Sequence, residues 1–169
     1  MFSKIFRFEF KSWFRLPIFY VYSVILFLLA LFIMAAAAGV FDSFTTTTIS
    51  ATYVNSPLNI TRLISSLSIF LYFMLPSIIG ASINKDFKHN VHHILFAYPL
   101  SKSSYLWAKF LSSFCVVLII IFFIYLGMYL GTIFPFTNSD LVTDFDILNY
   151  LQPFLYIVLP NFLFFGIVV

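Results

Sequence analysis

Four long segments of this chain carry no charged residue, and shorter segments that contain charges separate them. The uncharged segments are residues 17–41, 63–84, 110–139 and 147–169. A helix needs about 20 mostly apolar residues to cross a bilayer, and a charge at its centre costs about 2.5–3.5 kcal/mol on insertion scales. Because lipid cannot satisfy unpaired backbone groups, helices are the expected structure. The pattern predicts membrane-spanning helices at 18–40, 63–83, 110–132 and 151–169.

Residues 1–16 have amphipathic spacing instead. The basic side chains of this segment recur at helical intervals and form one stripe, made of Lys4, Arg7, Lys11 and Arg15. Aromatic side chains occupy the opposite side. This pattern predicts a helix that lies in the headgroup plane, with its basic stripe on anionic lipid. Pro17 ends the helix and turns the chain into the first span.

Glu9 departs from this pattern, because it projects toward the aromatic side of the 1–16 helix. A bare carboxylate in that position is costly, so we expect it to have a cationic partner. Lys85 and Lys88 are the candidates. The sequence is equally compatible with a Glu9 that extends toward the headgroups or pairs with a neighbouring turn.

A second amphipathic segment, residues 85–98, lies between the second and third predicted spans. Its apolar residues form one helical stripe. The opposite face holds a basic and aromatic set, made of Lys85, Lys88, His89, His92 and Phe96. A large aromatic residue exposed among cations is a candidate anchor for a protein partner. A surface helix that only links two spans explains the pattern equally well.

The composition and charge distribution support a membrane location. The chain is 62% hydrophobic and 9% charged, whereas a soluble domain has roughly 25% charged residues. Eight of the nine basic residues lie within 4–15 and 85–109, while residues 136–152 hold three aspartates and no Lys or Arg. Cytoplasmic loops carry the excess of Lys and Arg, so we expect a cytoplasmic N-terminus. Because the positive charge lies at membrane edges, we exclude nucleic acid as a partner.

The sequence offers little catalytic or cofactor chemistry. It lacks a GxxxxGK[ST] loop, so any ATP must be bound by another polypeptide. His89, His92 and His93 have helical spacing, but no cysteine or HExxH motif supports a metal site there. No ionisable residue falls within a predicted span, which disfavours an intramembrane enzyme. We therefore expect no catalytic residue, metal or cofactor in this chain.

Gly127 and Gly131 form a GxxxG pattern inside the third predicted span. Such a pair of glycines lets two helices approach with their backbones in close contact. The pattern is also common in apolar helices without this role. It makes these two residues candidates for helix packing.

Two segments resemble a known family. The run Ile-Leu-Phe-Ala-Tyr-Pro-Leu-Ser-Lys at 94–102, with the preceding residues from Asn84, resembles the loop after the second span in ATP-binding-cassette (ABC) permeases of the type-2, exporter-like class. Residues 8–15 resemble the interfacial helix at the start of those permeases. The resemblance implies an all-α integral membrane permease of a bacterial inner membrane. Residues 85–98 would be a coupling helix that contacts a separate ABC ATPase subunit.

The resemblance also implies a function and further partners. The chain would couple ATP hydrolysis by the ATPase to substrate movement across the membrane. Such permeases have more spans than this chain, so we expect a second permease half or further C-terminal spans. Residues 151–169 look truncated, and some bacterial members with a similar start continue into a zinc aminopeptidase domain. The alternative function is a membrane scaffold or anchor without transport activity.

Overall fold

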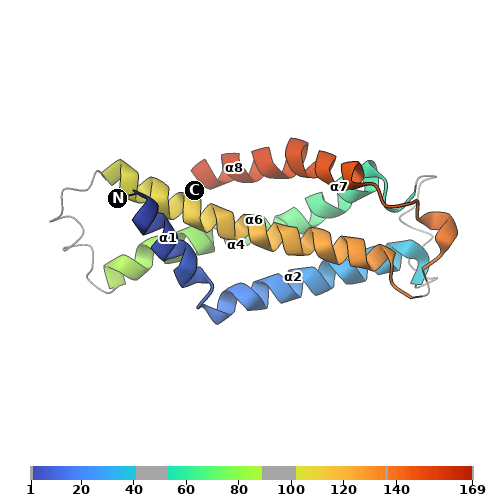
Figure 1. Ribbon diagram of the computed structural model, residues 1–169, viewed down its shortest axis with the longest axis horizontal. Coiled ribbons are helices and arrows are strands. Elements are labelled where there is room, and N and C mark those ends of the chain that lie inside the picture. The colour runs from blue at the N-terminus through green and yellow to red at the C-terminus, as the bar shows by residue number, and fades with distance from the viewer. Residues whose placement is uncertain (1, 41–52, 89–101, 136, 169) are drawn as a thin grey trace.

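The bundle is built from helices that are long enough to cross a membrane. The computed structural model describes residues 2–40, 53–88, 102–135 and 137–168, and the regular structure in these residues is all helical. Four of the helical segments have the length and apolarity of membrane spans: Pro17–Val40, Pro57–Ile78, Ser103–Thr132 and Ile147–Val168. They run lengthwise along an elongated bundle (Figure 1). The predicted all-helical fold with four candidate spans is confirmed.

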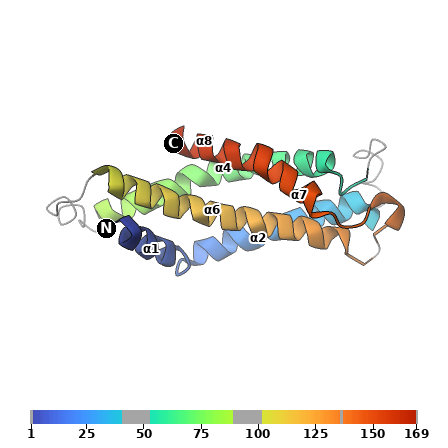
Figure 2. The same ribbon diagram turned by 45° about the horizontal axis from the view of Figure 1, so that its top comes forward.

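The helical elements follow the order of the chain. The first half contains α1 (Phe2–Trp13), α2 (Pro17–Ala35), the π-helical continuation η1 (Ala36–Val40) and α4 (Pro57–Lys88). The second half contains α6 (Lys102–Thr132), η2 (Ser139–Leu141), α7 (Ile147–Pro153), η3 (Phe154–Val158) and α8 (Leu159–Val168). Figures 1 and 2 show that α1, the end of α4 and the start of α6 share one end of the bundle, here called the basic end. The opposite end, with residues 140–146, is called the aspartate end.

The second and third spans begin earlier than the sequence pattern predicts. α4 begins at Pro57, six residues before the predicted start at Leu63, and α6 begins at Lys102 instead of Phe110. The prediction stopped at the flanking charges Arg62 and Lys109, whereas the helical backbone continues through both. The start of α4 has its own local signals, because Ser56 accepts a hydrogen bond from the Asn59 N–H at 3.5 Å and proline occupies the first helical position.

Close packing of α6 on α2 makes the most extensive helix contact of the bundle. A Cβ atom added at Gly127 would lie 2.5 Å from the Phe27 carbonyl oxygen. At Gly131 it would lie 2.7 Å from the Met34 Cβ and 2.8 Å from the Leu31 carbonyl oxygen. Both distances are too short for a side chain, so the two glycines allow the backbones to approach. They are the two residues of the GxxxG pattern.

Polar contacts tie the loops together at the aspartate end. The Asn55 side chain donates to the Thr143 carbonyl at 2.7 Å and accepts from the Thr143 N–H at 3.0 Å. The Val54 N–H donates to Leu141, and the Asn138 N–H donates to Ala38. Gly39 has φ 91°, a left-handed conformation that glycine adopts easily where the chain leaves a helix. These contacts place the start of α4 beside the segment that leads into α7.

The last span is interrupted where its prolines lie. Asp146 caps α7 by accepting a hydrogen bond from the Leu148 N–H at 2.9 Å. Pro153 ends α7 because proline has no N–H and its ring crowds the preceding turn. The chain then continues as the π-helical segment η3 before α8 resumes the α-helical form. The span is therefore Ile147–Val168 with a wider turn near its first third.

Candidate functional site

α1 packs against the basic end of α6 and buries one face there. Glu9 and Trp13, one turn apart, are the buried residues of α1. The basic residues of the predicted stripe are exposed: Lys4, Arg7 and Lys11 on α1, and Arg15 in the turn that follows the helix. The apolar side of α1 is thus covered by protein at Glu9 and Trp13. The row of aromatic side chains on α1 continues past the end of the helix. The Phe14 ring, in the turn after α1, contacts the Phe19 ring of α2, with ring centroids 5.1 Å apart.

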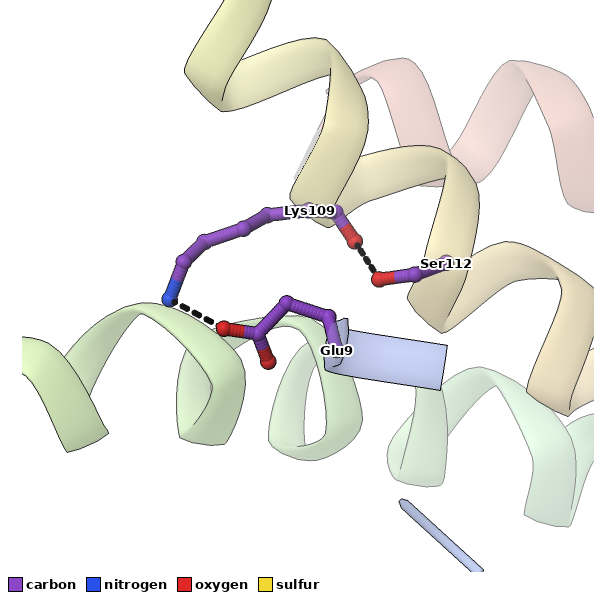
Figure 3. Close-up of polar contacts among 3 residues, drawn as sticks. All are labelled: Glu9, Lys109 and Ser112. Carbon is purple, nitrogen blue, oxygen red and sulfur yellow. Dashed lines mark hydrogen bonds and ion pairs between the residues drawn. The ribbon is translucent and has the colours of Figure 1, made fainter. Parts of the chain in front are cut away.

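A buried ion pair joins α1 to α6. The Lys109 Nζ lies 3.3 Å from a Glu9 carboxylate oxygen, and Figure 3 shows the lysine side chain extending from α6 toward the carboxylate. Glu9 is 5% exposed and Lys109 is 2% exposed. The ammonium group also lies 5.2 Å from the centroid of the Tyr105 ring, one turn earlier on α6. A buried pair of this kind holds two elements in one relative position, because neither charge is stable there alone.

The position of Lys109 along α6 explains how the pair is tolerated. Lys109 and Thr132 are 23 residues apart in one helix, which is about 35 Å at 1.5 Å per residue. The hydrocarbon core of a bilayer is about 30 Å thick. If Thr132 lies near one edge of that core, Lys109 lies near the other edge, where its long stem runs through apolar surroundings. With this placement, the ion pair would lie near a membrane interface.

Other buried polar groups lie beside the pair. Ser112 is fully buried and donates its hydroxyl to the Lys109 carbonyl at 2.8 Å (Figure 3). The Ser113 Oγ and the Trp13 Nε1 are buried and have no hydrogen-bond partner among the described residues. They lie one helical turn beyond Lys109 and Glu9 respectively, on the same faces. The junction of α1 and α6 thus holds the buried ion pair together with several buried uncharged polar groups.

Glu9 has a cationic partner, as expected: the structure describes Lys109, at the start of the third span, as a cationic partner of Glu9. The backbone of the predicted candidates, Lys85 and Lys88, forms the last turn of α4, but their side chains lie outside the described part of the chain. A signal for Lys109 was present, since it follows the interfacial aromatics Tyr105 and Trp107 and directly precedes the third uncharged segment.

The helices that contain the second and third predicted spans extend past the uncharged segments and include two cations. Arg62 falls inside the helix Pro57–Ile78, and Lys109 falls inside Ser103–Thr132. The extension has a physical cause: hydropathy treats a charge as the end of a span, whereas an ion pair or a snorkelling side chain lets the helix continue.

The residues predicted to contact an ATPase lie mostly outside the described residues. This applies to His89, His92 and Phe96, and to His93 of the weak metal pattern. Their segment connects the end of α4 to the start of α6, so both of its ends are at the basic end, near α1. In the described parts of the chain, no group of three or more His, Cys, Asp or Glu residues is arranged to hold a metal ion.

The fold and the buried pair together define a class of protein. Four apolar helices of spanning length make this a multi-pass helical membrane protein. Comparison of the chain with protein-family models, curated proteins and solved structures found no match.

Proposed function

We propose that this chain is a membrane-spanning permease component of an ATP-driven ABC transporter. A separate ATPase subunit would hydrolyse ATP, and this chain would couple that hydrolysis to substrate movement across the membrane. The observation that supports the proposal is the Glu9–Lys109 pair, which fixes α1 to the start of α6. A partner that moves the segment before α6 would therefore move α1 as well.

The helix contacts suggest which parts would move together. α6 packs extensively on both α2 and α1, whereas its contacts with α4 and α8 are smaller. α4 in turn contacts α7, η3 and α8. The bundle thus contains one group made of α1, α2 and α6, and a second made of α4 and the last span. A push on the segment that joins α4 to α6 would shift one group against the other.

The proposal assigns the basic end to the cytoplasmic side of the inner membrane. There the basic stripe of α1 would bind anionic headgroups, and residues 85–98 would contact the ATPase through Lys85, Lys88, His89, His92 and Phe96. A second permease half or further spans would complete the translocation path. This orientation follows the positive-inside rule, because every Lys and Arg of the chain except Arg62 lies at the basic end.

Cysteine labelling will test the orientation. We expect Ser139→Cys to react with a membrane-impermeant maleimide in intact cells, and Ser103→Cys to react only after permeabilisation. Both serines are exposed, and they lie at opposite ends of the bundle. The background is Cys115→Ala, which removes the only native thiol and serves as the unlabelled control. The reverse labelling pattern would overturn the proposed orientation.

Phe96→Asp will test the ATPase contact. Purified from its native membrane, the parent chain should carry ATP hydrolysis activity with it. We expect the ATP hydrolysis activity that copurifies with the variant to be more than about tenfold lower than with the parent chain. The reason is that an aromatic anchor contributes about 2 kcal/mol or more to an interface. Membrane insertion should not change.

The matched control is Phe134→Asp, an equivalent change at an exposed phenylalanine near the aspartate end. It should retain the copurified ATPase activity. If no ATP hydrolysis copurifies with the parent chain, or if Phe96→Asp retains it in full, the permease proposal fails and the scaffold function becomes the better explanation.

A further inference from the structure

An open groove of about 530 Å³ lies at the aspartate end, between the first turns of α4 and the interrupted last span. The α4 side contributes Pro57, Leu58, Thr61 and Arg62, and the other side contributes Gln152, Pro153, Tyr156 and Ile157. Most of the lining is apolar, and the polar groups are few. The π-helical turn after Pro153 forms one wall, and wider turns of this kind are frequent at functional sites.

Arg62 is the unusual residue of this groove. It is the one basic residue outside the two basic segments, and it lies five residues inside the helix that begins at Pro57, about 7–8 Å along its axis. No ion pair joins it to an acidic residue within the described residues. An arginine near the end of a span extends its guanidinium group toward the headgroup level, where a phosphate can pair with it. Its side chain is exposed, so a partner from outside the chain can reach it.

The chemistry of the groove selects an amphiphile with an acidic head. A guanidinium group binds phosphate oxygens through paired N–H donors, and the neighbouring Thr61 and Gln152 offer further polar atoms. The apolar remainder suits an acyl chain. Because the groove lies along a candidate span, the surrounding lipid supplies such molecules at high local concentration.

We propose that this groove binds an anionic phospholipid from the leaflet at the aspartate end, with the phosphate on Arg62 and an acyl chain along Leu58 and Tyr156. The site is separate from the Glu9–Lys109 junction, which lies at the opposite end of the bundle. It is also independent of the proposed ATPase contact. Binding of this kind would hold α4 against the last span through a lipid rather than through side chains alone.

Bromine quenching in lipid vesicles tests the proposal. The chain carries Tyr156→Trp, a position that is 79% exposed, in a Trp107→Phe background. The signal of Trp13 is removed by subtracting the same chain without the new tryptophan. Brominated phosphatidylglycerol and brominated phosphatidylcholine are compared at equal mole fraction. We expect the phosphatidylglycerol to bind about fivefold more strongly, the preference that one cation gives to an anionic lipid.

The preference should disappear in Arg62→Gln and remain in Arg62→Lys, which keeps the charge. A matched probe, Phe164→Trp on α8, is also largely exposed but does not line the groove, and it should show no preference between the lipids. An unchanged preference in Arg62→Gln would overturn the proposal. Failure of both lipids to quench the Tyr156→Trp probe would also overturn it, because the groove would then be covered by another helix or a second copy of the chain.

Discussion

Replacing Lys109 with methionine is expected to lower the free energy of unfolding by about 3 kcal/mol. The substitution keeps the length and the apolar stem of the side chain but removes the ammonium group 3.3 Å from the Glu9 carboxylate. Glu9 is buried, so water does not replace the lost partner fully. Removing one member of a buried pair costs far more than removing an exposed charge.

Detergent-induced unfolding of the purified chain measures this loss, and Trp13 fluorescence reports on α1. Trp13 is buried against α6, so its emission should shift to longer wavelength if α1 leaves the bundle. A Trp107→Phe background removes the second tryptophan. The matched control is Lys11→Met, an exposed lysine of α1, which should change the free energy of unfolding by less than about 0.5 kcal/mol.

A double-mutant cycle separates the pair from its surroundings. Glu9→Gln combined with Lys109→Met should be less destabilising than the sum of the single changes, with a coupling of about 0.5–3 kcal/mol. If Lys109→Met unfolds like the Lys11→Met control and leaves Trp13 emission unchanged, the pair does not hold α1 in place. Movement of α6 would then not be transmitted to α1 through this pair.

Replacing Gly127 with alanine is expected to destabilise the bundle by about 1–3 kcal/mol, the usual range for overpacking. The added Cβ would lie 2.5 Å from the Phe27 carbonyl oxygen, a backbone atom that cannot move without shifting α2. Gly131→Ala should have an effect of similar size, because its Cβ would meet both a side chain and the backbone of α2. The same detergent unfolding measurement applies.

Gly80→Ala is the matched control for these glycines. It lies inside α4, and a Cβ added there meets no atom of the described residues within 4 Å. Alanine also favours a helix over glycine by about 1 kcal/mol, so this variant should be as stable as the parent chain or more stable. Equal stability of Gly80→Ala and Gly127→Ala would show that the close approach of α2 and α6 is not needed.

Breaking the ion pair and separating α2 from α6 should affect different helix contacts of the bundle. Loss of the pair frees α1 while leaving the core contact of α6 intact. Overpacking at Gly127 or Gly131 shifts α6 against α2 and thereby changes the span itself. We expect the two effects on stability to be nearly additive, because the two sites share no residue in contact.

Several features of the fold could be predicted from the sequence. Long uncharged segments predicted the four spans, because the cost of burying charge in lipid dominates where a helix can cross. The position of Glu9 on an apolar face predicted that it needs a cation. The choice of cation was not predictable, since Lys109 is 100 residues away in the chain and only the packing of α1 on α6 brings it close.

The groove at Arg62 was also hidden from the sequence. Its two walls come from the start of α4 and from the turn after Pro153, which lie far apart in the chain. The loop contacts of Asn55 with Thr143 help bring these walls together. The start of α4 itself was within reach of the sequence, because Ser56 followed by Pro57 is a typical helix beginning.

The sequence by itself determined that this chain is a membrane protein with several helical spans, one basic end and one acidic end. Apolarity and charge act residue by residue through transfer from water to lipid, so they can be read along the chain. Only the tertiary structure decided that Glu9 pairs with Lys109, that α2 packs on the two glycines of α6, and that Arg62 lines a groove. These features depend on distances between helices, and such distances are set by packing rather than by hydropathy.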